Sequence, residues 1–306
     1  MRMLNYNLLD VFTTTLFGGN QLAVFSNGEG LTSEQMQMIA KELNLSETVF
    51  LFPPTTERRH FKLKIFTPAM ELPFAGHPTI GTAFLLGEKK MTPYSHDGLT
   101  ALTVEENIGL VPLHLYAENG EITKAEMIQP IPEVTDQMLD YKACATLLSL
   151  DEQDLDTELP IQTISAGIPF LFIPIKSLEA MKKIQFRMDV WQKLFSNDEN
   201  KRHIFAFSVE TEQEDAHVHS RMFAPAMGIS EDPATGSASG PLGFYLVENK
   251  LIEHHDGLIT IISEQGIEMG RPSRIEITLE RIEGKISKVL VGGSAVIIGE
   301  GSLRLP

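Results

Sequence analysis

The chain has 306 residues, 42% hydrophobic and 22% charged, which is normal for a soluble globular protein of one large domain or two of ordinary size. It carries 25 lysines and arginines against 41 aspartates and glutamates, and this net charge of −16 argues against nucleic acid or an anionic membrane as partner. The single cysteine, Cys144, excludes an intrachain disulfide, and with no signal peptide and no apolar run of about 18 residues we expect a cytoplasmic protein.

Short apolar or alternating runs predict many strands and few helices. In the first part of the chain, strands are expected at 4–12, 22–25, 48–52, 62–66 and 110–116, and helices at 32–43 and 78–89. Later strands are expected at 122–129, 163–164, 170–175, 203–209, 217–223, 258–262, 274–279, 288–292 and 295–299, and helices at 136–147, 188–195 and 238–249. Thr32 and Gln35 have the spacing of a capping box at the first helix. Because the helices do not alternate strictly with strands, we expect an α+β fold.

An internal repeat indicates two related halves. The sequence FTPAM at 66–70 recurs as FAPAM at 223–227, each time after a strand and before a loop and a helix. Both helices combine small residues with an apolar second half, which suits burial on all sides. We expect each half to be a sheet wrapped around a central helix. One half would span 1–118, with 294–306 as a candidate addition, and the other 119–293, with the active site between them.

The two repeated helices offer a way for an acidic protein to bind an anion. A helix N-terminus presents unpaired N–H groups and about half a positive charge, so the amides at Gly76 and Gly236 could hold a carboxylate without basic side chains.

Polar side chains near these helix starts are candidates for chemistry. Asp232 and Ser237 flank the start of the second helix, and His77 lies at the start of the first. The alternative is that Asp232 and Ser237 only cap the helix and that His77 is an ordinary polar N-terminal residue.

Glu47 and Asn20 are further candidates. Glu47 precedes the apolar residues 49–52, so burial could raise its pKa toward that of a general acid or base, although it could equally be a solvated glutamate at a strand edge. Asn20, after two glycines, could either satisfy a turn or reach a ligand.

The segment HVHSR places His217, His219 and Arg221 on one face of a strand, where they could form a metal or an anion site. A further alternative is therefore a metal hydrolase that uses His217 and His219. No third ligand at a defined spacing accompanies them. The chain also lacks GxxxxGK[ST], GxGxxG after a strand, and GxSxG. We therefore expect neither a metal nor a cofactor.

The sequence resembles the PhzF family, the phenazine biosynthesis-like proteins, from about Asp10 to the last few residues. The resemblance rests on DVFTTTLFGGNQLAVF, LNLSETVFLF, FTPAMELPFAGHPTIGTAFLL, RMFAPAMGISEDPATGSASGPLGFYL, QGIEMGRPSRI and VGGSAVIIGEG. It implies a diaminopimelate epimerase-like fold of two pseudo-symmetric α+β domains, each a mostly antiparallel sheet around a central helix. In the family's characterised isomerase a glutamate moves a proton on a dihydro-hydroxyanthranilate, assisted by a histidine, an aspartate and a serine. The matching positions here are Glu47, His77, Asp232 and Ser237.

The related diaminopimelate epimerases and proline racemases use two cysteines at the helix starts. Neither helix start holds a thiol here, and Cys144 belongs to another predicted helix, so two-thiol racemisation is excluded on chemical grounds.

These observations predict a cofactor-independent isomerase or epimerase that moves a proton on carbon of a small carboxylate substrate. Glu47 would transfer the proton. His77 and Asp232 would polarise the substrate or shuttle protons, and Ser237 would orient the ligand. Asn20, Gly76 and Gly236 would bind the substrate. A non-catalytic protein that binds small carboxylates is the alternative. We expect no nucleic acid or membrane partner, and a homodimer because two-fold dimers are the commonest oligomers.

Overall fold

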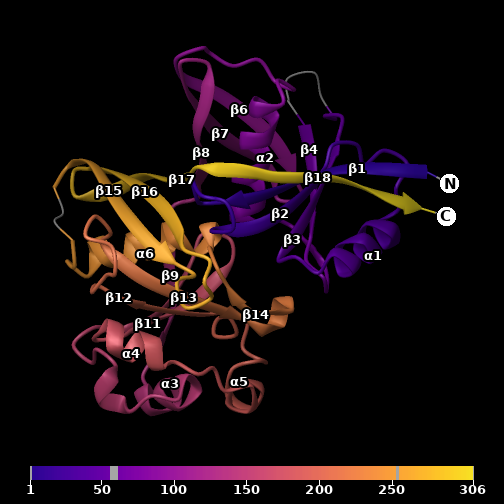
Figure 1. The fold of residues 1–306 in the computed structure, drawn as a ribbon. Coiled ribbons are helices and arrows are strands. Elements are labelled where there is room, and N and C mark those ends of the chain that lie inside the picture. Colours follow the sequence, from indigo (N-terminus) through magenta and orange to yellow (C-terminus); the bar gives the residue numbers. More distant parts are fainter. Residues whose placement is uncertain (1, 56–60, 253–254, 306) are drawn as a thin grey trace. The chain divides into compact units, whose positions relative to one another are not determined.

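The computed structural model describes residues 2–55, 61–252 and 255–305 and contains two compact units (Figure 1). Unit 1 consists of Met1–Ile128 and Gly292–Pro306, and unit 2 of Gln129–Val291. The C-terminal strand β18 (Ala295–Leu305) lies in unit 1, where it pairs antiparallel with β1 (Arg2–Val11). Residue 118, where the sequence predicted the end of the first half, is the last residue of β7 (Gly109–Glu118). This strand forms a hairpin with β8 (Glu121–Gln129).

Unit 1 is a sheet with the pairing order β18–β1–β2–β3–β4–β6–β7–β8. Its remaining strands are β2 (Asn20–Phe25), β3 (Glu47–Phe52), β4 (Phe61–Phe66), β5 (Glu71–Leu72) and β6 (Gly98–Glu106). The pairs β2/β3 and β4/β6 are parallel and the others antiparallel, while the short β5 pairs with β4. The helices are α1 (Ser33–Leu43) and α2 (Gly76–Glu88).

Helix α2 forms the centre of unit 1, and every residue from Gly76 to Gly87 is buried. It contacts β1, β2, β3, β7 and β18, and Figure 1 shows it enclosed by the strands of its unit. Close packing explains the small residues, because a Cβ at Gly81 would lie 2.5 Å from a methyl of Val11 and 2.8 Å from one of Leu22. The prediction of a helix buried on all sides is confirmed.

Unit 2 repeats the pairing order as β9–β10–β11–β12–β13–β15–β16. Its strands are β9 (Glu133–Met138), β10 (Ile161–Ser165), β11 (Pro169–Pro174), β12 (Ile204–Ser208), β13 (Val218–Ala224), β14 (Ile229–Asp232), β15 (Gly257–Gln265), β16 (Ser273–Ile282) and β17 (Lys285–Gly293). The pairs β11/β12 and β13/β15 are parallel, and β14 pairs with β13 as β5 does with β4. Helix α6 (Gly236–Glu248) corresponds to α2. The α+β fold with two pseudo-symmetric halves is confirmed.

The smaller helices of unit 2 are α3 (Tyr141–Leu148), α4 (Leu178–Lys183) and α5 (Met188–Leu194). Short 3₁₀ turns occupy Glu152–Asp154 and Pro225–Met227. Throughout residues 2–55, 61–252 and 255–305, no helix is long and apolar enough to cross a membrane.

The helix expected at 136–147 begins later than predicted. Residues 136–138 belong to β9, which pairs antiparallel with β10, and Asp140 accepts a hydrogen bond from the Ala143 N–H as the N-cap of α3. Strands β6 and β9 were not predicted, because β9 has no buried residue and the first residues of β6 are mostly exposed, which hides their alternation. The capping box of α1 is confirmed, with Thr32 and Gln35 bonding reciprocally.

Candidate active site

Unit 1 brings together three of the predicted site residues. Glu47 is the first residue of β3, Asn20 is the first residue of the parallel neighbour β2, and His77 is the second residue of α2. His77 Nε2 lies 3.2 Å from Glu47 Oε2, and His77 Nδ1 lies 3.1 Å from Asn20 Nδ2. All three residues are buried, with exposed fractions of 0% for Asn20, 6% for Glu47 and 3% for His77. The imidazole therefore lies between an amide and a carboxylate.

His77 is neutral at physiological pH. Burial lowers the pKa of His77 to about 3, and a contact with the Gln21 carbonyl opposes this shift only in part. When the Asn20 amide donates from Nδ2 to Nδ1, the ring proton is on Nε2, the nitrogen that lies 3.2 Å from Glu47 Oε2. In this tautomer the hydrogen-bond donor of the imidazole is the nitrogen beside the carboxylate.

The start of α6 holds the other predicted acid. Asp232, buried at the end of β14, accepts a hydrogen bond from the Thr235 hydroxyl at 2.6 Å. Gln265, the last residue of β15, accepts from the Thr235 N–H at 3.1 Å and donates to the Asp232 carbonyl at 2.7 Å. A network of hydrogen bonds therefore fixes Asp232 and the helix start together. Sequence reasoning missed Thr235 and Gln265.

The two helix starts have the same layout. Gly76 opens α2 and Gly236 opens α6, and the preceding residues Ala75 and Thr235 make no side-chain capping bond. Ser237 then occupies in α6 the place that His77 has in α2, and it is half-buried. The backbone N–H groups of both first turns are therefore not capped by the side chain before them, as an anion site requires.

A family model described as "phenazine biosynthesis-like protein" matches residues 9–301, nearly the whole chain. The chain belongs to this PhzF family. A protein of Mesorhizobium japonicum named an uncharacterized isomerase is 36% identical, with 99% of both chains covered. The trans-2,3-dihydro-3-hydroxyanthranilate isomerase of Pseudomonas chlororaphis is 34% identical over 99% of this chain and 100% of its own. The protein is accordingly an enzyme of the isomerase class.

Solved structures agree with the fold. A phenazine biosynthesis protein of the PhzF family from Bacillus anthracis matches with a TM-score of 0.88 at 29% identity, with both chains covered completely. A hydroxyproline epimerase from Agrobacterium vitis matches with a TM-score of 0.65 over 99% of this chain and 92% of its own, and at 11% identity this likeness concerns the fold alone.

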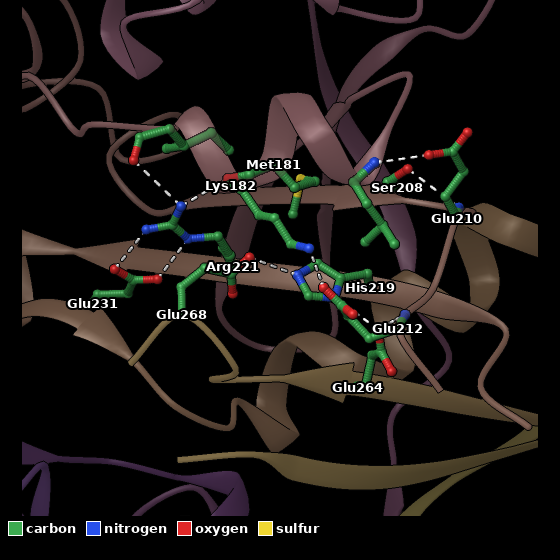
Figure 2. Close-up of polar contacts among 12 residues, drawn as sticks. Met181, Lys182, Ser208, Glu210, Glu212, His219, Arg221, Glu231, Glu264 and Glu268 are labelled. Carbon is green, nitrogen blue, oxygen red and sulfur yellow. Dashed lines mark hydrogen bonds and ion pairs between the residues drawn. The ribbon is translucent and has the colours of Figure 1, made fainter. Parts of the chain in front are cut away.

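The histidines of the HVHSR segment have other partners in this PhzF-family protein. Figure 2 shows His219 between Glu264 and Glu268, whose oxygens lie 2.7 Å from Nδ1 and 2.9 Å from Nε2. Burial disfavours the imidazolium, but the two carboxylates outweigh it and raise the pKa of His219 to about 9. His217 Nδ1 accepts from the Ile262 N–H at 3.1 Å.

Arg221, which follows on the same strand, is also fully engaged. It binds Glu231 through two parallel bonds of 2.7 and 3.0 Å and donates to the Met181 carbonyl (Figure 2). These contacts indicate an ionic network that ties β13 to β14 and α4. In the part of the chain that the structure describes, no group of three or more His, Cys, Asp or Glu side chains could hold a metal ion.

The thiol of the PhzF-family protein belongs to neither of the helices that open with Gly76 and Gly236. Cys144 is in α3, fully buried in the hydrophobic core of unit 2, and burial raises the pKa of Cys144 to about 12. A thiol with so high a pKa is not a nucleophile or base at neutral pH.

Proposed function

We propose that this protein is a cofactor-independent isomerase or epimerase that moves a proton on carbon of a small carboxylate substrate. The observation that carries the proposal is the contact between Glu47 and His77, in which a buried carboxylate faces a neutral imidazole at 3.2 Å. A side chain that accepts a proton from carbon must be a base within reach of the substrate and shielded from water.

In the proposed reaction Glu47 takes a proton from one carbon of the substrate and returns it to another position. The electron pair of the broken C–H bond stays on the substrate as an enolate-like anion. While it is held on the carboxylate of Glu47 the proton exchanges with solvent, and Glu47 then delivers one proton to the substrate, so no electrons are gained or lost and no redox cofactor is required. His77, with its proton on Nε2, would hold Glu47 in place and share its proton during the transfer.

We assign binding to the helix starts. The Gly76 and Gly236 amides would hold the substrate carboxylate or the developing enolate, where fixed N–H dipoles stabilise negative charge. Asp232, held by Thr235, would polarise the substrate, and Ser237 and Asn20 would orient it. This assignment predicts that changes at either helix start impair the same reaction.

The first substrate to test is trans-2,3-dihydro-3-hydroxyanthranilate, because relatives of 34% identity bear the name of its isomerase. Cyclic and amino-acid carboxylates should be screened beside it in deuterated water, with loss of a C–H signal as the readout. The homodimer and the cytoplasmic location stay predictions from the sequence.

The test of the proposal is Glu47→Gln, which keeps the size of the side chain and removes the base. We expect solvent deuterium incorporation into a turned-over substrate to fall by at least about 10²-fold, the usual contribution of general base catalysis, while ligand binding is largely retained. Glu42→Gln, at an exposed position of α1, is the matched control. Unchanged exchange in Glu47→Gln would refute the assignment. A wild-type protein that binds carboxylates without exchange would instead be the non-catalytic binding protein.

A further inference from the structure

A buried acid lies beneath the start of α2 and has no part in the mechanism above. Glu106 is the last residue of β6 and is 5% exposed. Its Oε1 lies 2.5 Å from the Thr79 hydroxyl, and that hydroxyl lies 2.6 Å from the Ala75 carbonyl oxygen. Three oxygens are thus joined in a row by two short contacts.

The number of hydrogens available in this row bears on the protonation state of Glu106. Two contacts between oxygens each need a hydrogen, and the Thr79 hydroxyl has only one. If Thr79 donates to the Ala75 carbonyl, which has no hydrogen of its own, the second hydrogen must belong to Glu106. The geometry therefore fits a protonated carboxyl that donates to Thr79.

The pseudo-symmetric place in unit 2 supports this interpretation. There Ser239 donates to the Thr235 carbonyl at 2.8 Å, as Thr79 does to Ala75. Gln265 follows Glu264, which pairs with His219, just as Glu106 follows Glu105, which pairs with Lys62. Gln265 on β15 therefore corresponds to Glu106 on β6. The amide of Gln265 carries hydrogens at every pH and hydrogen-bonds the same helix start. A neutral carboxyl is the closest equivalent of that amide in shape and hydrogen bonding.

The row of oxygens ends at the peptide unit that the proposed function needs. The Ala75 carbonyl and the Gly76 N–H belong to one planar peptide group, so a bond that holds the carbonyl also fixes the direction of the N–H. We propose that Glu106 is a positioning residue, whose protonated carboxyl holds the Ala75 carbonyl through Thr79 and thereby aims the Gly76 amide at the substrate carboxylate. The inference rests on the proposed function for the role of Gly76.

The arrangement makes the α2 start sensitive to pH. Burial raises the pKa of Glu106 to about 8, against the opposing contacts of Thr79 and the Ala75 N–H. Above that pH the Thr79 hydroxyl hydrogen turns to the carboxylate, and the Ala75 carbonyl loses its side-chain hydrogen bond and keeps only the backbone bond of the helix.

Titratable groups reach this region from several elements. They are Glu105 on β6, Lys62 on β4, Glu71 on β5 and His77 on α2. Lys62 and Glu105 line the same pocket as Glu106, and Glu105 is itself bound by the Thr55 hydroxyl. On β7 the paired residue is Gly109, which has no charge.

We call the row of contacts from Glu106 through Thr79 to the Ala75–Gly76 peptide the relay. It is tested without any ligand by following the amide resonance of Gly76 by NMR from pH 6 to 10 in ¹⁵N-labelled protein. We expect the Gly76 signal to titrate with a midpoint near 8, and Gly236, next to Gln265, to show no titration with that midpoint. In Glu106→Gln the Gly76 signal should stop titrating. Gln265→Glu should transfer the titration to Gly236. A Gly76 signal that is flat in the wild type, or that titrates unchanged in Glu106→Gln, would overturn the relay.

Two further variants separate positioning from folding. Thr79→Val removes the hydroxyl and should abolish the Gly76 titration, whereas Thr79→Ser retains it. With trans-2,3-dihydro-3-hydroxyanthranilate as probe, we expect the KM of the wild type to rise about 2- to 10-fold from pH 7 to 9, the effect of one hydrogen bond, and the KM of Glu106→Gln to stay level. A titrating Gly76 with a level wild-type KM would refute positioning. If the probe is not turned over, the proposed function fails for this substrate, while the NMR titration still decides the relay.

Discussion

His77 Nε2 lies 3.2 Å from Glu47 Oε2, and the other ring nitrogen lies 3.1 Å from the Asn20 amide nitrogen. Burial keeps the imidazole neutral, so the two nitrogens have different roles, one as acceptor and one as donor. The position of the ring proton matters for the proposed reaction, because Nε2 is the nitrogen beside the carboxylate that we propose as the base. A hydrogen bond from the Asn20 amide to Nδ1 favours the tautomer with the proton on Nε2.

Replacing Asn20 with alanine should reduce the preference for the tautomer with the proton on Nε2. Without the amide donor, Nδ1 no longer has to act as an acceptor and can instead carry the proton. In the wild type, ¹⁵N chemical shifts of His77 should show the proton on Nε2, and in Asn20→Ala the Nδ1–H form should increase. We expect kcat to fall about 10-fold with the loss of one hydrogen bond of 1–1.5 kcal/mol. Wild-type shifts that place the proton on Nδ1 would contradict the assignment.

The bond from Thr235 to Asp232 yields a second prediction. Thr235→Val removes the hydroxyl that donates to the carboxylate at 2.6 Å and accepts from Gln265 at 3.0 Å. We expect a loss of about 1–3 kcal/mol in the free energy of unfolding, because buried polar partners are left unsatisfied, and a lower kcat/KM. Thr235 makes no side-chain cap, so the loss would not come from helix capping.

Thr235→Ser is the matched control, since it retains the hydroxyl. Thr235 is 3% exposed, so the loss of its buried methyl group should lower the free energy of unfolding in urea by only about 0.8 kcal/mol, and kcat/KM should stay at the wild-type value. If Thr235→Val is as stable and as active as Thr235→Ser, the hydroxyl does not hold Asp232.

The repeated motif predicted the central helices for two reasons. Its pattern of small and apolar residues lies within one short segment, and the same pattern occurs in both halves of the chain. Small residues at each helix start and apolar residues after them require burial on all sides, and both α2 and α6 are buried in this way. Thr32 and Gln35 were predictable for the same reason, since a capping box depends on neighbours in sequence.

The partners of the site residues depended on strand pairing and could not be predicted in the same way. Gln265 reaches Thr235 only because β15 pairs in parallel with β13, and Glu106 reaches Thr79 by the equivalent pairing of β6 with β4. No local sequence pattern indicates such contacts. They could have been found only by aligning the two halves beyond the repeated helices as far as β6 and β15, where Glu106 and Gln265 occupy corresponding positions.

The thiol of Cys144 should be unreactive in the folded protein. Burial raises its pKa to about 12, so hardly any thiolate is present at pH 8, and the side chain lies in the core. An aromatic disulfide reagent should label Cys144 in urea but not in buffer. Cys144→Ala should retain the isomerase activity. Rapid labelling of the native protein, or loss of activity in a folded Cys144→Ala variant, would contradict this.

The His219 cluster should make the folded state less stable at alkaline pH. The pKa of His219 is about 9 in the folded protein and 6.5 when unperturbed, so below pH 6.5 both states are protonated and the contribution of the cluster is complete. As the pH rises from 6.5 to 9 the unfolded state loses its proton first, and stability falls by up to about 3 kcal/mol.

Two measurements check this alkaline loss. Urea unfolding from pH 6 to 10 should be done in the Glu106→Gln background, because Glu106 titrates in the same direction. The Cε1–H resonance of His219 should titrate near pH 9 and should move toward lower pH in Glu268→Gln, which removes the carboxylate at 2.9 Å and keeps Glu264 at 2.7 Å. A His219 resonance that titrates near 6.5 in the folded protein would show that the two carboxylates do not hold the imidazolium. Stability would then be independent of this cluster between pH 6.5 and 9.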